Sequence, residues 1–346
     1  MGPLAEKAEG ARGRAPARRG RLSADSPLLG GSLDTGAGAE EPRAAPVDYD
    51  PGTDDPYRLP TPPPREAELD ADPRLLRELI PVEEPGRELD DWGRSERVFE
   101  LMEPLLNFYY RYWFRVEVEG IENVPDEGGA LLVSNHSGAL PPDAPMIMQS
   151  LRNEHPSPRP LYMLGENWFK GYPGVGMLAN KIGMVSAHPS NAQRLLRDEG
   201  RLVLVFPEGQ KGTRKLYWQR YRLRRFGRGG FVKTALRAGV PVVPIAVIGA
   251  EEAMPIFAHV PLLQRLTGLI YFPVNHAFPH MGLAAGLLYM PAKFKVRFLE
   301  PIHFDGYGAD DADDIELVQS LAEGIRERIQ REVDELISAR TSVWFG

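Results

Sequence analysis

Short apolar runs alternate with segments of helical periodicity throughout residues 116–304. Several of the runs are almost entirely apolar, which is typical of strands buried on both faces of a sheet. Between the runs, apolar residues recur at the three- and four-residue spacing of a helix. This alternation predicts a single α/β domain with a mostly buried central sheet and helices on both of its faces. Strands are expected at residues 116–120, 130–133, 160–165, 183–187, 201–206, 240–248 and 294–299, and helices at residues 166–170, 173–180, 190–198 and 229–238.

Two longer amphipathic helices are expected at the ends of the domain, which is predicted to span residues 95–346 with its core at residues 116–304. Residues 97–115 carry apolar and aromatic side chains at helical spacing. This helix either packs on its own domain or lies in a membrane interface, and the pattern favours neither alternative. A closing helix at residues 314–339 has one apolar face. That face consists of Ile315, Val318, Leu321, Ile325, Ile329, Val333 and Leu336.

Residues 1–94 differ in composition from the rest of the chain. They are rich in Pro, Gly, Ala, Arg and acidic residues and sustain neither a helical nor a strand period, which predicts a disordered tail. Residues 73–80 show a short helical pattern within it. The basic first part of the tail suits contact with anionic lipid or nucleic acid, but a solvated tail is the favoured interpretation.

The composition of the 346 residues excludes several classes of protein. With 41 Lys and Arg against 48 Asp and Glu, the net charge of −7 argues against a nucleic-acid-binding protein, so a cationic site must be local. The chain has no cysteine, which excludes disulfides, thiol nucleophiles and thiolate metal sites. We find neither a secretory signal nor a run of about 18 apolar residues. Placement in the cytoplasm is therefore expected, with peripheral membrane contact left open.

The first candidate for chemistry is the segment NHSGALPPD at residues 135–143. His136 stands just after an apolar strand, and a Gly/Pro loop separates it from Asp143, which occupies the position of a helix N-cap. In this arrangement Asp143 orients the imidazole, and His136 takes a proton from an attacking hydroxyl. The competing interpretation is structural: His136 caps backbone groups and Asp143 only begins a helix.

The second candidate is the segment FPEGQKGTR at residues 206–214. Glu208 follows a buried strand, and Gly209 begins a loop whose backbone can approach a ligand closely. Lys211 and Arg214 supply cations for a phosphate. The segment is not a P-loop, since it lacks GK[ST]. The competing interpretation places Glu208 in a structural ion pair with Arg214.

Two further segments indicate contact with lipids. Residues 214–228 interleave arginines with aromatic residues, which favours the phosphate of a lipid or of coenzyme A, with a solvated loop as the alternative. Residues 254–290 are apolar but repeatedly interrupted by Pro, Gly and His. They are expected to insert into one leaflet or to cover an acyl chain, or else to form part of the core.

Four motifs resemble the glycerolipid acyltransferase family typified by lysophosphatidic acid acyltransferases: NHSGALPPD, GMVSAH, FPEG and VPVVPIAV, in this order. The resemblance implies transfer of an acyl group from a thioester of coenzyme A or acyl carrier protein to a lipid hydroxyl at a membrane surface, with no metal or other cofactor. It makes His136 the general base and Asp143 its orienting carboxylate. By the same resemblance, Glu208 and Gly209 belong to the acceptor-binding block, and residues 240–244 lie near the acyl pocket.

Two departures from the family pattern concern the acceptor. Six residues separate His136 from Asp143, where the family usually has four, which resembles a divergent branch that includes acyltransferases of neutral lipids. GMVSA is followed by His188, where the family usually has an arginine that grips the acceptor phosphate. Either Lys211 or Arg214 substitutes for that arginine, or the acceptor is an uncharged alcohol such as diacylglycerol.

The reaction requires a histidine base and donors for the developing oxyanion. The predicted donors are the backbone N–H groups of Ser137 and Gly138, or those just after Asp143. A covalent serine intermediate is disfavoured because the chain lacks a G-x-S-x-G elbow. The sequence therefore predicts a peripheral membrane O-acyltransferase acting on 1-acylglycerol-3-phosphate. The alternatives are a neutral-lipid acyltransferase and a catalytically silent lipid-binding or membrane-tethering protein, and the oligomeric state is left open.

Overall fold

The computed structural model describes residues 89–137, 141–165, 175–267, 273–276 and 289–346. Three predicted features lie outside the described residues: the tail up to residue 88 with its short helix, the helical turn at residues 166–170, and much of the apolar segment 254–290.

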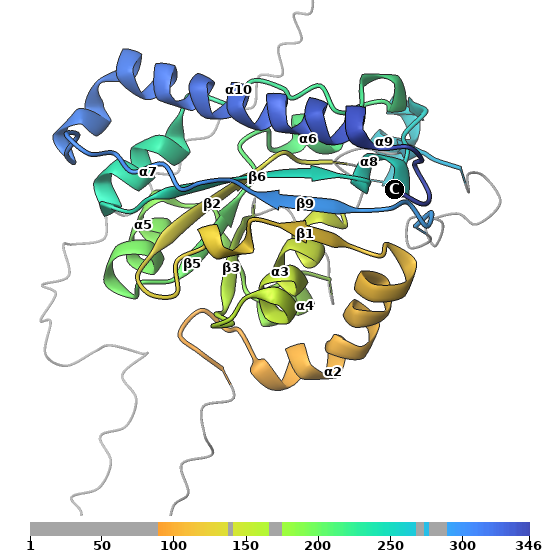
Figure 1. The fold of residues 1–346 in the computed structure, drawn as a ribbon, viewed down its shortest axis with the longest axis horizontal. Helices are drawn as coiled ribbons and strands as arrows, with labels where there is room; N and C mark the ends of the chain where they lie inside the picture. Colours follow the sequence, from red (N-terminus) through yellow and green to blue (C-terminus); the bar gives the residue numbers. More distant parts are fainter. Residues whose placement is uncertain (1–88, 138–140, 166–174, 268–272, 277–288) are drawn as a thin grey trace, which may run out of the picture. The chain divides into compact units, whose positions relative to one another are not determined.

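Seven strands form the central sheet (Figure 1): β1 Glu117–Glu119, β2 Ala130–Ser134, β3 Leu161–Gly165, β4 Met184–Ser186, β5 Leu202–Val205, β6 Val242–Ile248 and β9 Lys295–Phe298. Their order in the sheet is β1-β9-β6-β2-β5-β3-β4, and the last five run parallel to one another. β9 pairs antiparallel with β6, and β1 pairs parallel with β9, so these two strands run the opposite way. The strands lie at the predicted apolar runs, and the predicted fold class is confirmed.

The apolar runs become strands because both faces of the sheet are covered. Along β2, Leu131 and Val133 belong to one core and Ala130 and Leu132 to the other, and all four are fully buried. A strand with two buried faces needs a continuous apolar run. One core is completed by residues 189–198 (α5 Pro189–Gln193 and a π-helical continuation), α7 (Gly230–Ala238) and α10 (Ile315–Ala339), and the other by α2 (Glu96–Asn107) and α3 (Asp143–Glu154), with α4 (Val175–Lys181) beside α2.

Helix α2 and the π-helical segment Phe108–Trp113 that continues it have two apolar faces. Phe99, Leu106 and Tyr110 are buried in the core, so this helix packs on its own domain. The opposite face exposes four large apolar or aromatic side chains at the spacing of one side of a helix. We call them the outer stripe, which consists of Leu101, Leu105, Phe108 and Tyr112. Contact of the outer stripe with a membrane stays a prediction.

Helix α10 has the predicted N-terminus and the predicted apolar face. Asp314 caps it, because its Oδ1 accepts the N–H groups of Glu316 and Leu317, both at 3.0 Å. Ile315 departs from the predicted face, since it is exposed in the first turn. The buried positions of this face are Val318, Ile325, Ile329, Val333 and Leu336.

The folded part of the chain begins ahead of Ser95, the predicted first residue of the domain. The indole N–H of Trp92 donates to Glu199 at 3.0 Å, and the hydroxyl of Tyr162 donates to the carboxylate of Asp90. Residues directly before Ser95 therefore contact the sheet domain and belong to it.

The chain after β6 folds into small elements that the apolar pattern did not predict. α8 (Ala250–Ala253) follows β6 directly, and β7 (Ala258–His259) pairs with β8 (Pro273–Val274) on either side of α9 (Pro261–Thr267). Leu262 and Leu266 of α9 are exposed. Within the described ranges, every helix is too short or too polar to cross a bilayer.

Candidate active site

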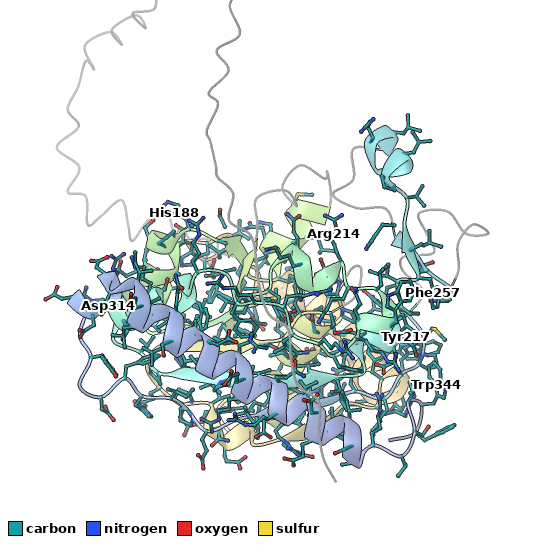
Figure 2. The ribbon with its side chains drawn as sticks, turned by 90° about the horizontal axis from the view of Figure 1, so that it is seen from above. His188, Arg214, Tyr217, Phe257, Asp314 and Trp344 are labelled. Atoms are coloured by element: carbon teal, nitrogen blue, oxygen red, sulfur yellow. The ribbon has the colours of Figure 1, made fainter. Side chains whose placement is uncertain are left out.

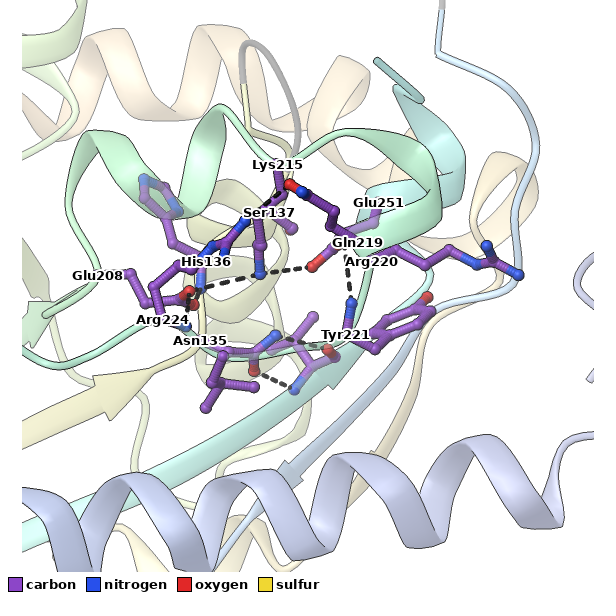
Figure 3. Close-up of polar contacts among 12 residues, drawn as sticks. Asn135, His136, Ser137, Glu208, Lys215, Gln219, Arg220, Tyr221, Arg224 and Glu251 are labelled. Atoms are coloured by element: carbon purple, nitrogen blue, oxygen red, sulfur yellow. Dashed lines mark hydrogen bonds and ion pairs between the residues drawn. The ribbon is translucent and has the colours of Figure 1, made fainter. Parts of the chain in front are cut away.

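The candidate residues gather at the carboxyl ends of the central parallel strands (Figure 3). β2 ends shortly before His136, and β5 ends shortly before Glu208. Because β2 and β5 are parallel neighbours, these two ends meet at one edge of the sheet. Open α/β sheets bind their ligands at this edge.

His136 and Asp143 form a hydrogen-bonded pair. Nδ1 of His136 lies 2.9 Å from Oδ2 of Asp143, whose side chain is 0% exposed. The same Oδ2 accepts the N–H of Ser137 at 3.0 Å and its hydroxyl at 3.1 Å. A carboxylate that faces three donors is held firmly, and as an acceptor it assigns the imidazole proton to Nδ1. The two residues that the sequence singled out therefore meet across their loop, while their catalytic roles stay predictions.

The prediction that Asp143 is the N-cap of its helix is wrong. Pro142 occupies the cap position of α3, and Asp143 is the first helical residue. Its Oδ1 accepts the N–H of Ala144 at 2.8 Å, while Oδ2 faces the loop. Because Oδ2 is occupied by His136 and Ser137, this oxygen serves the loop rather than the free N–H groups of the helix.

Two of the amides predicted as oxyanion donors already have acceptors. The N–H groups of Ser137 and Ala144 both donate to Asp143. Pro145, the next residue of the helix, has no N–H. Gly138 lies outside the described residues. The described amides therefore hold the Asp143 carboxylate, which the spacing of the motif did not reveal.

Three strands position the imidazole of His136. Its ring stacks on Phe206, which follows β5, with 4.0 Å between ring centroids and 17° between the planes. Just before it, the side-chain amide of Asn135 makes two hydrogen bonds of 2.9 Å with the backbone of Val247 in β6. The His136 side chain is 14% exposed, and Nδ1 faces the carboxylate, so Nε2 is the nitrogen available to a substrate.

Glu208 binds the backbone of its own protein. Its Oε1 accepts the N–H of His136 at 3.0 Å, and its Oε2 accepts the N–H of Arg224 at 2.7 Å (Figure 3). Glu208 forms an ion pair with Lys215 at 3.5 Å, and its predicted pairing with Arg214 stays a prediction. Glu208 is buried, so the structure shows it positioning His136, while contact with the acceptor stays a prediction.

Two glycines let the segment after Glu208 fold against the histidine. Gly209 has φ 54° and ψ −145°, a backbone conformation that is almost exclusive to glycine. At Gly212, in the short helix α6 (Gln210–Thr213), an added Cβ would lie 2.8 Å from Cβ of His136 and 2.9 Å from Cβ of Glu208. The predicted close approach of this loop is therefore to His136, and the role of Gly209 in acceptor binding stays a prediction.

The predicted phosphate ligands Lys211 and Arg214 are both exposed. They stand on either side of Gly212 in the chain, and Gly212 touches His136. Both cations are therefore neighbours in the chain of a glycine that lies against the candidate base. Their binding of a phosphate stays a prediction.

His188 lies apart from these residues. It follows β4, the edge strand, and three strand intervals of about 5 Å each separate β4 from β2. Its Nδ1 accepts the N–H of Ser190 at 3.3 Å, which caps α5. Figure 2 shows His188 well separated from Arg214. The structure describes His188 as a helix cap, and its contact with a substrate stays a prediction.

The structure adds three buried or half-buried contacts that the sequence did not predict, made by Lys215, Arg224 and Glu251. Lys215 and Arg224 belong to a basic segment that was expected to face a ligand or solvent. The burial of Lys215 depends on Glu251, which lies in a distant part of the chain. Glu251 did have a signal, because it comes three residues after the end of the buried strand β6 and therefore lies at the same edge as His136.

Comparison with known proteins decides the family. A model of the acyltransferase family matches residues 115–248, a range that includes His136, Asp143 and Glu208. An uncharacterized protein of Mycobacterium tuberculosis is 44% identical over 246 residues, which cover 71% of this chain and 68% of that protein. The chain belongs to the acyltransferase family. The resemblance seen in the sequence motifs is thereby confirmed, while its assignment to a divergent branch of the family stays a prediction.

Two further relatives have names that state what they synthesise. The DGAT1/2-independent enzyme synthesizing storage lipids of Gallus gallus is 26% identical over 220 residues, covering 64% of this chain and 61% of that enzyme. The chloroplastic phytyl ester synthase 2 of Arabidopsis thaliana is 28% identical over 159 residues, covering 43% of this chain and 22% of that enzyme. The crystal structure of the 1-acyl-sn-glycerophosphate acyltransferase PlsC from Thermotoga maritima aligns with a TM-score of 0.47 at 20% identity, over 78% of this chain and 88% of that one.

Proposed function

We propose that this acyltransferase moves an acyl group from a coenzyme A or acyl-carrier-protein thioester to the hydroxyl of a lipid, with His136 as the general base. The observation that carries the proposal is the 2.9 Å contact between a partly exposed imidazole and a fully buried carboxylate. A histidine with only a capping role gains little from a buried carboxylate at Nδ1, whereas a general base needs one to orient it and stabilise its charge.

In the proposed reaction, Nε2 of His136 removes the proton of the acceptor hydroxyl while the hydroxyl oxygen attacks the thioester carbonyl. A C–O bond forms, and the tetrahedral intermediate then collapses with cleavage of the C–S bond. The imidazolium gives the proton to the leaving thiolate, so the histidine ends the cycle neutral. Asp143 stabilises the transient imidazolium through Nδ1, and its burial strengthens that interaction.

The first acceptor that we propose is 1-acylglycerol-3-phosphate. Lys211 and Arg214 support it, because both are exposed and flank the glycine that packs on His136. A phosphate bound by these cations would hold the glycerol hydroxyl next to the base. The same two cations also suit the phosphates of coenzyme A, so the assay must separate a donor effect from an acceptor effect.

A neutral alcohol is the second candidate acceptor. His188 stands where the family pattern has a phosphate-gripping arginine, and in this structure it caps a helix. The names of the relatives from Gallus gallus and Arabidopsis thaliana concern storage lipids and phytyl esters. An uncharged hydroxyl requires no cation, so this candidate predicts activity that does not depend on Lys211 or Arg214.

We also propose that the reaction takes place at a lipid surface that the outer stripe contacts. Leu101 is 81% exposed and Tyr112 is 72% exposed, although the rest of their helix is packed on the domain. Exposed apolar side chains aligned on one helix face suit the interface of a bilayer. Arg111, which is exposed next to Tyr112, suits the phosphates of the headgroups.

The proposed function is tested by thiol release from acyl-coenzyme A, and in parallel from acyl carrier protein, by the purified protein. The acceptors are 1-acylglycerol-3-phosphate and diacylglycerol, and His136→Ala is compared with His303→Ala, a matched change at an exposed histidine outside the site. We expect release that requires an acceptor, disappears in His136→Ala and persists in His303→Ala.

The acceptor dependence separates the candidates. Release with 1-acylglycerol-3-phosphate supports the first acceptor, and Lys211→Ala should then raise the KM for that acceptor more than the KM for acyl-coenzyme A. Release with diacylglycerol alone supports the neutral-lipid candidate. Absence of release with both donors and both acceptors would contradict the proposal and favour a lipid-binding or tethering protein.

A further inference from the structure

A buried lysine lies between two buried carboxylates, one of which accepts the backbone N–H of His136 (Figure 3). Nζ of Lys215 is 2.7 Å from Oε1 of Glu251 and 3.5 Å from Oε2 of Glu208. The side chains are 1%, 5% and 0% exposed, in that order. We call Glu208, Lys215 and Glu251 the ion triad. None of the three takes part in the proposed proton transfers, and Lys215 and Glu251 also lack the direct contact with His136 that Glu208 makes.

Each carboxylate of the ion triad also accepts backbone N–H groups from segments at the site. Glu208 accepts the N–H of His136 at 3.0 Å and that of Arg224 at 2.7 Å. Glu251 accepts the N–H of Tyr221 at 3.0 Å. The backbone of the histidine and the backbone of residues 221–224 are therefore held by the same cluster of charges.

The positive charge of Lys215 is what allows both carboxylates to act as acceptors. Two buried carboxylates this close repel each other, and without a cation one of them would bind a proton or turn away. A protonated Glu208 would present a hydroxyl donor toward the N–H of His136 or of Arg224. At least one of these amides would then lose its acceptor. Nζ of Lys215 is in ion-pair contact with both carboxylates, so its charge is shared between them.

We propose that Lys215 is a positioning residue of the acyl-transfer site, which keeps His136 in register with residues 221–224 by holding Glu208 and Glu251 together. The proposal rests on the proposed function, because this register matters for a reaction at His136. Arg222 and Arg224 are exposed on the segment that Lys215 holds. Lys215 therefore also sets where these cations stand relative to the base.

The test compares Lys215→Met with Lys233→Met, a matched change at a lysine whose ion pair with Asp313 is exposed. Methionine keeps much of the length of lysine and removes its charge. We expect Lys215→Met to lower kcat on the order of 100-fold, as displacement of a catalytic group by about 1 Å does, with a smaller change in KM. Lys233→Met should match the unchanged protein. Circular dichroism confirms that both variants are folded.

Amide hydrogen exchange supplies a readout that does not need enzymatic activity. In Lys215→Met the amides of His136, Tyr221 and Arg224 should exchange faster, while those of Leu131 and Leu132 in the centre of β2 should keep their protection. If wild-type protein transfers no acyl group, the proposed function fails, and exchange still decides whether Lys215 positions these amides. Unchanged exchange in Lys215→Met would overturn the proposal.

A second pair of variants shows whether Lys215 acts through Glu208. Glu208→Gln has one side-chain oxygen and therefore cannot accept both amides. If Lys215 works through Glu208, adding Lys215→Met to Glu208→Gln should lower kcat by less than threefold. The double variant also leaves fewer unpaired buried charges than Lys215→Met alone, which favours its folding. A further loss on the order of 100-fold would overturn the proposal. So would a failure of both Lys215 variants to fold, since the lysine would then be purely structural.

Discussion

Asp143 and Glu208 each use both of their oxygens to hold protein groups. Asp143 accepts from His136, from Ser137 and from Ala144, and Glu208 accepts from His136 and from Arg224. A carboxylate carries only acceptors, so it can satisfy several donors at once, whereas an amide of the same shape brings donors of its own. Replacing either carboxylate by its amide is therefore a change of chemistry at nearly constant volume.

Asp143→Asn is expected to slow thiol release strongly. The amide group cannot accept from His136 and Ser137 with its nitrogen, so the imidazole loses its orientation and the stabilisation of its positive charge. We expect kcat for thiol release to fall about 10²- to 10⁴-fold, with circular dichroism unchanged. Activity close to that of the unchanged protein would show that Asp143 has a structural role alone.

The buried Glu251 is expected to make the stability of the domain depend on pH. Burial raises the pKa of Glu251 from 4.5 to about 7, against the opposing effect of Lys215 and of the Tyr221 N–H, while Glu208 adds to the rise. The folded state thus favours the protonated form. Its contribution to the free energy of unfolding is complete below the unfolded pKa of 4.5 and is lost as the pH rises through about 7.

Glu251→Gln cannot ionise and should lack this loss. We expect the stability of the unchanged protein, relative to Glu251→Gln, to fall by about 3 kcal/mol between pH 4.5 and pH 7 in urea unfolding. Glu122→Gln, at an exposed position, serves as the control. A difference that stays constant over this range would contradict the raised pKa.

The elements of this protein show how one helix can serve two environments. Helix α2 and its continuation bury Phe99, Leu106 and Tyr110 in the core and expose the outer stripe. A surface helix of a protein in water normally has one apolar face and one polar face. The second apolar face therefore needs an apolar partner, and the proposed lipid substrate suggests the bilayer.

The double variant Leu101→Glu/Phe108→Glu is expected to bind lipid vesicles more weakly than the unchanged protein. Each buried apolar side chain contributes about 1.5–3 kcal/mol, so vesicle binding should weaken at least tenfold for each residue. Sedimentation with vesicles of phosphatidylcholine and phosphatidylglycerol measures the change. Ile315→Glu changes an exposed apolar residue of α10 and should leave binding as it was. Equal vesicle binding by Leu101→Glu/Phe108→Glu and by Ile315→Glu would show that the outer stripe does not contact the membrane.

Across the whole molecule, the end of α10 is tied to the edge of the sheet that carries the site. Arg340, just after α10, pairs with Glu252 of α8 at 2.9 Å, and both side chains are buried. Glu252 also accepts the hydroxyl of Tyr221, and Glu251 beside it belongs to the ion triad. Helix α10 and the edge that carries the candidate site are therefore linked through largely buried charges.

Arg340→Met is expected to destabilise the domain strongly. Arg340 is the nearer of the two cations described at Glu252, since Arg220 lies 3.7 Å from the same carboxylate, and removing a partner of a buried ion pair costs about 3–5 kcal/mol. Arg328→Met, which breaks a contact with the exposed Glu300 at 3.7 Å, should cost less than about 1 kcal/mol. Urea unfolding of the two variants measures both values. Similar losses would show that the pair of Arg340 and Glu252 is no more important than a surface contact.

The sequence by itself determined the strands of the central sheet, the long helices at the ends of the domain, and the identity of the His136–Asp143 pair. Strands such as β2 and β6 are buried on both faces, so their residues form continuous apolar runs. Such runs can be recognised in the sequence without knowing which strands pair with them. The N-terminus of α10 was predictable because Asp314 caps amides within its own first turn. His136 and Asp143 were found because they lie on one short loop after a buried strand.

The tertiary structure alone decided what each side chain faces. Lys215 reads in the sequence as one more cation of a basic segment, and its burial depends on Glu251 at the end of a different strand. The same holds for the reversed direction of β9, the turn of the Asp143 carboxylate toward Ser137, and the separation of His188 from the site. Residue patterns record how much of a segment is buried, whereas partners distant in the chain are set by the pairing of strands and the packing of helices on them.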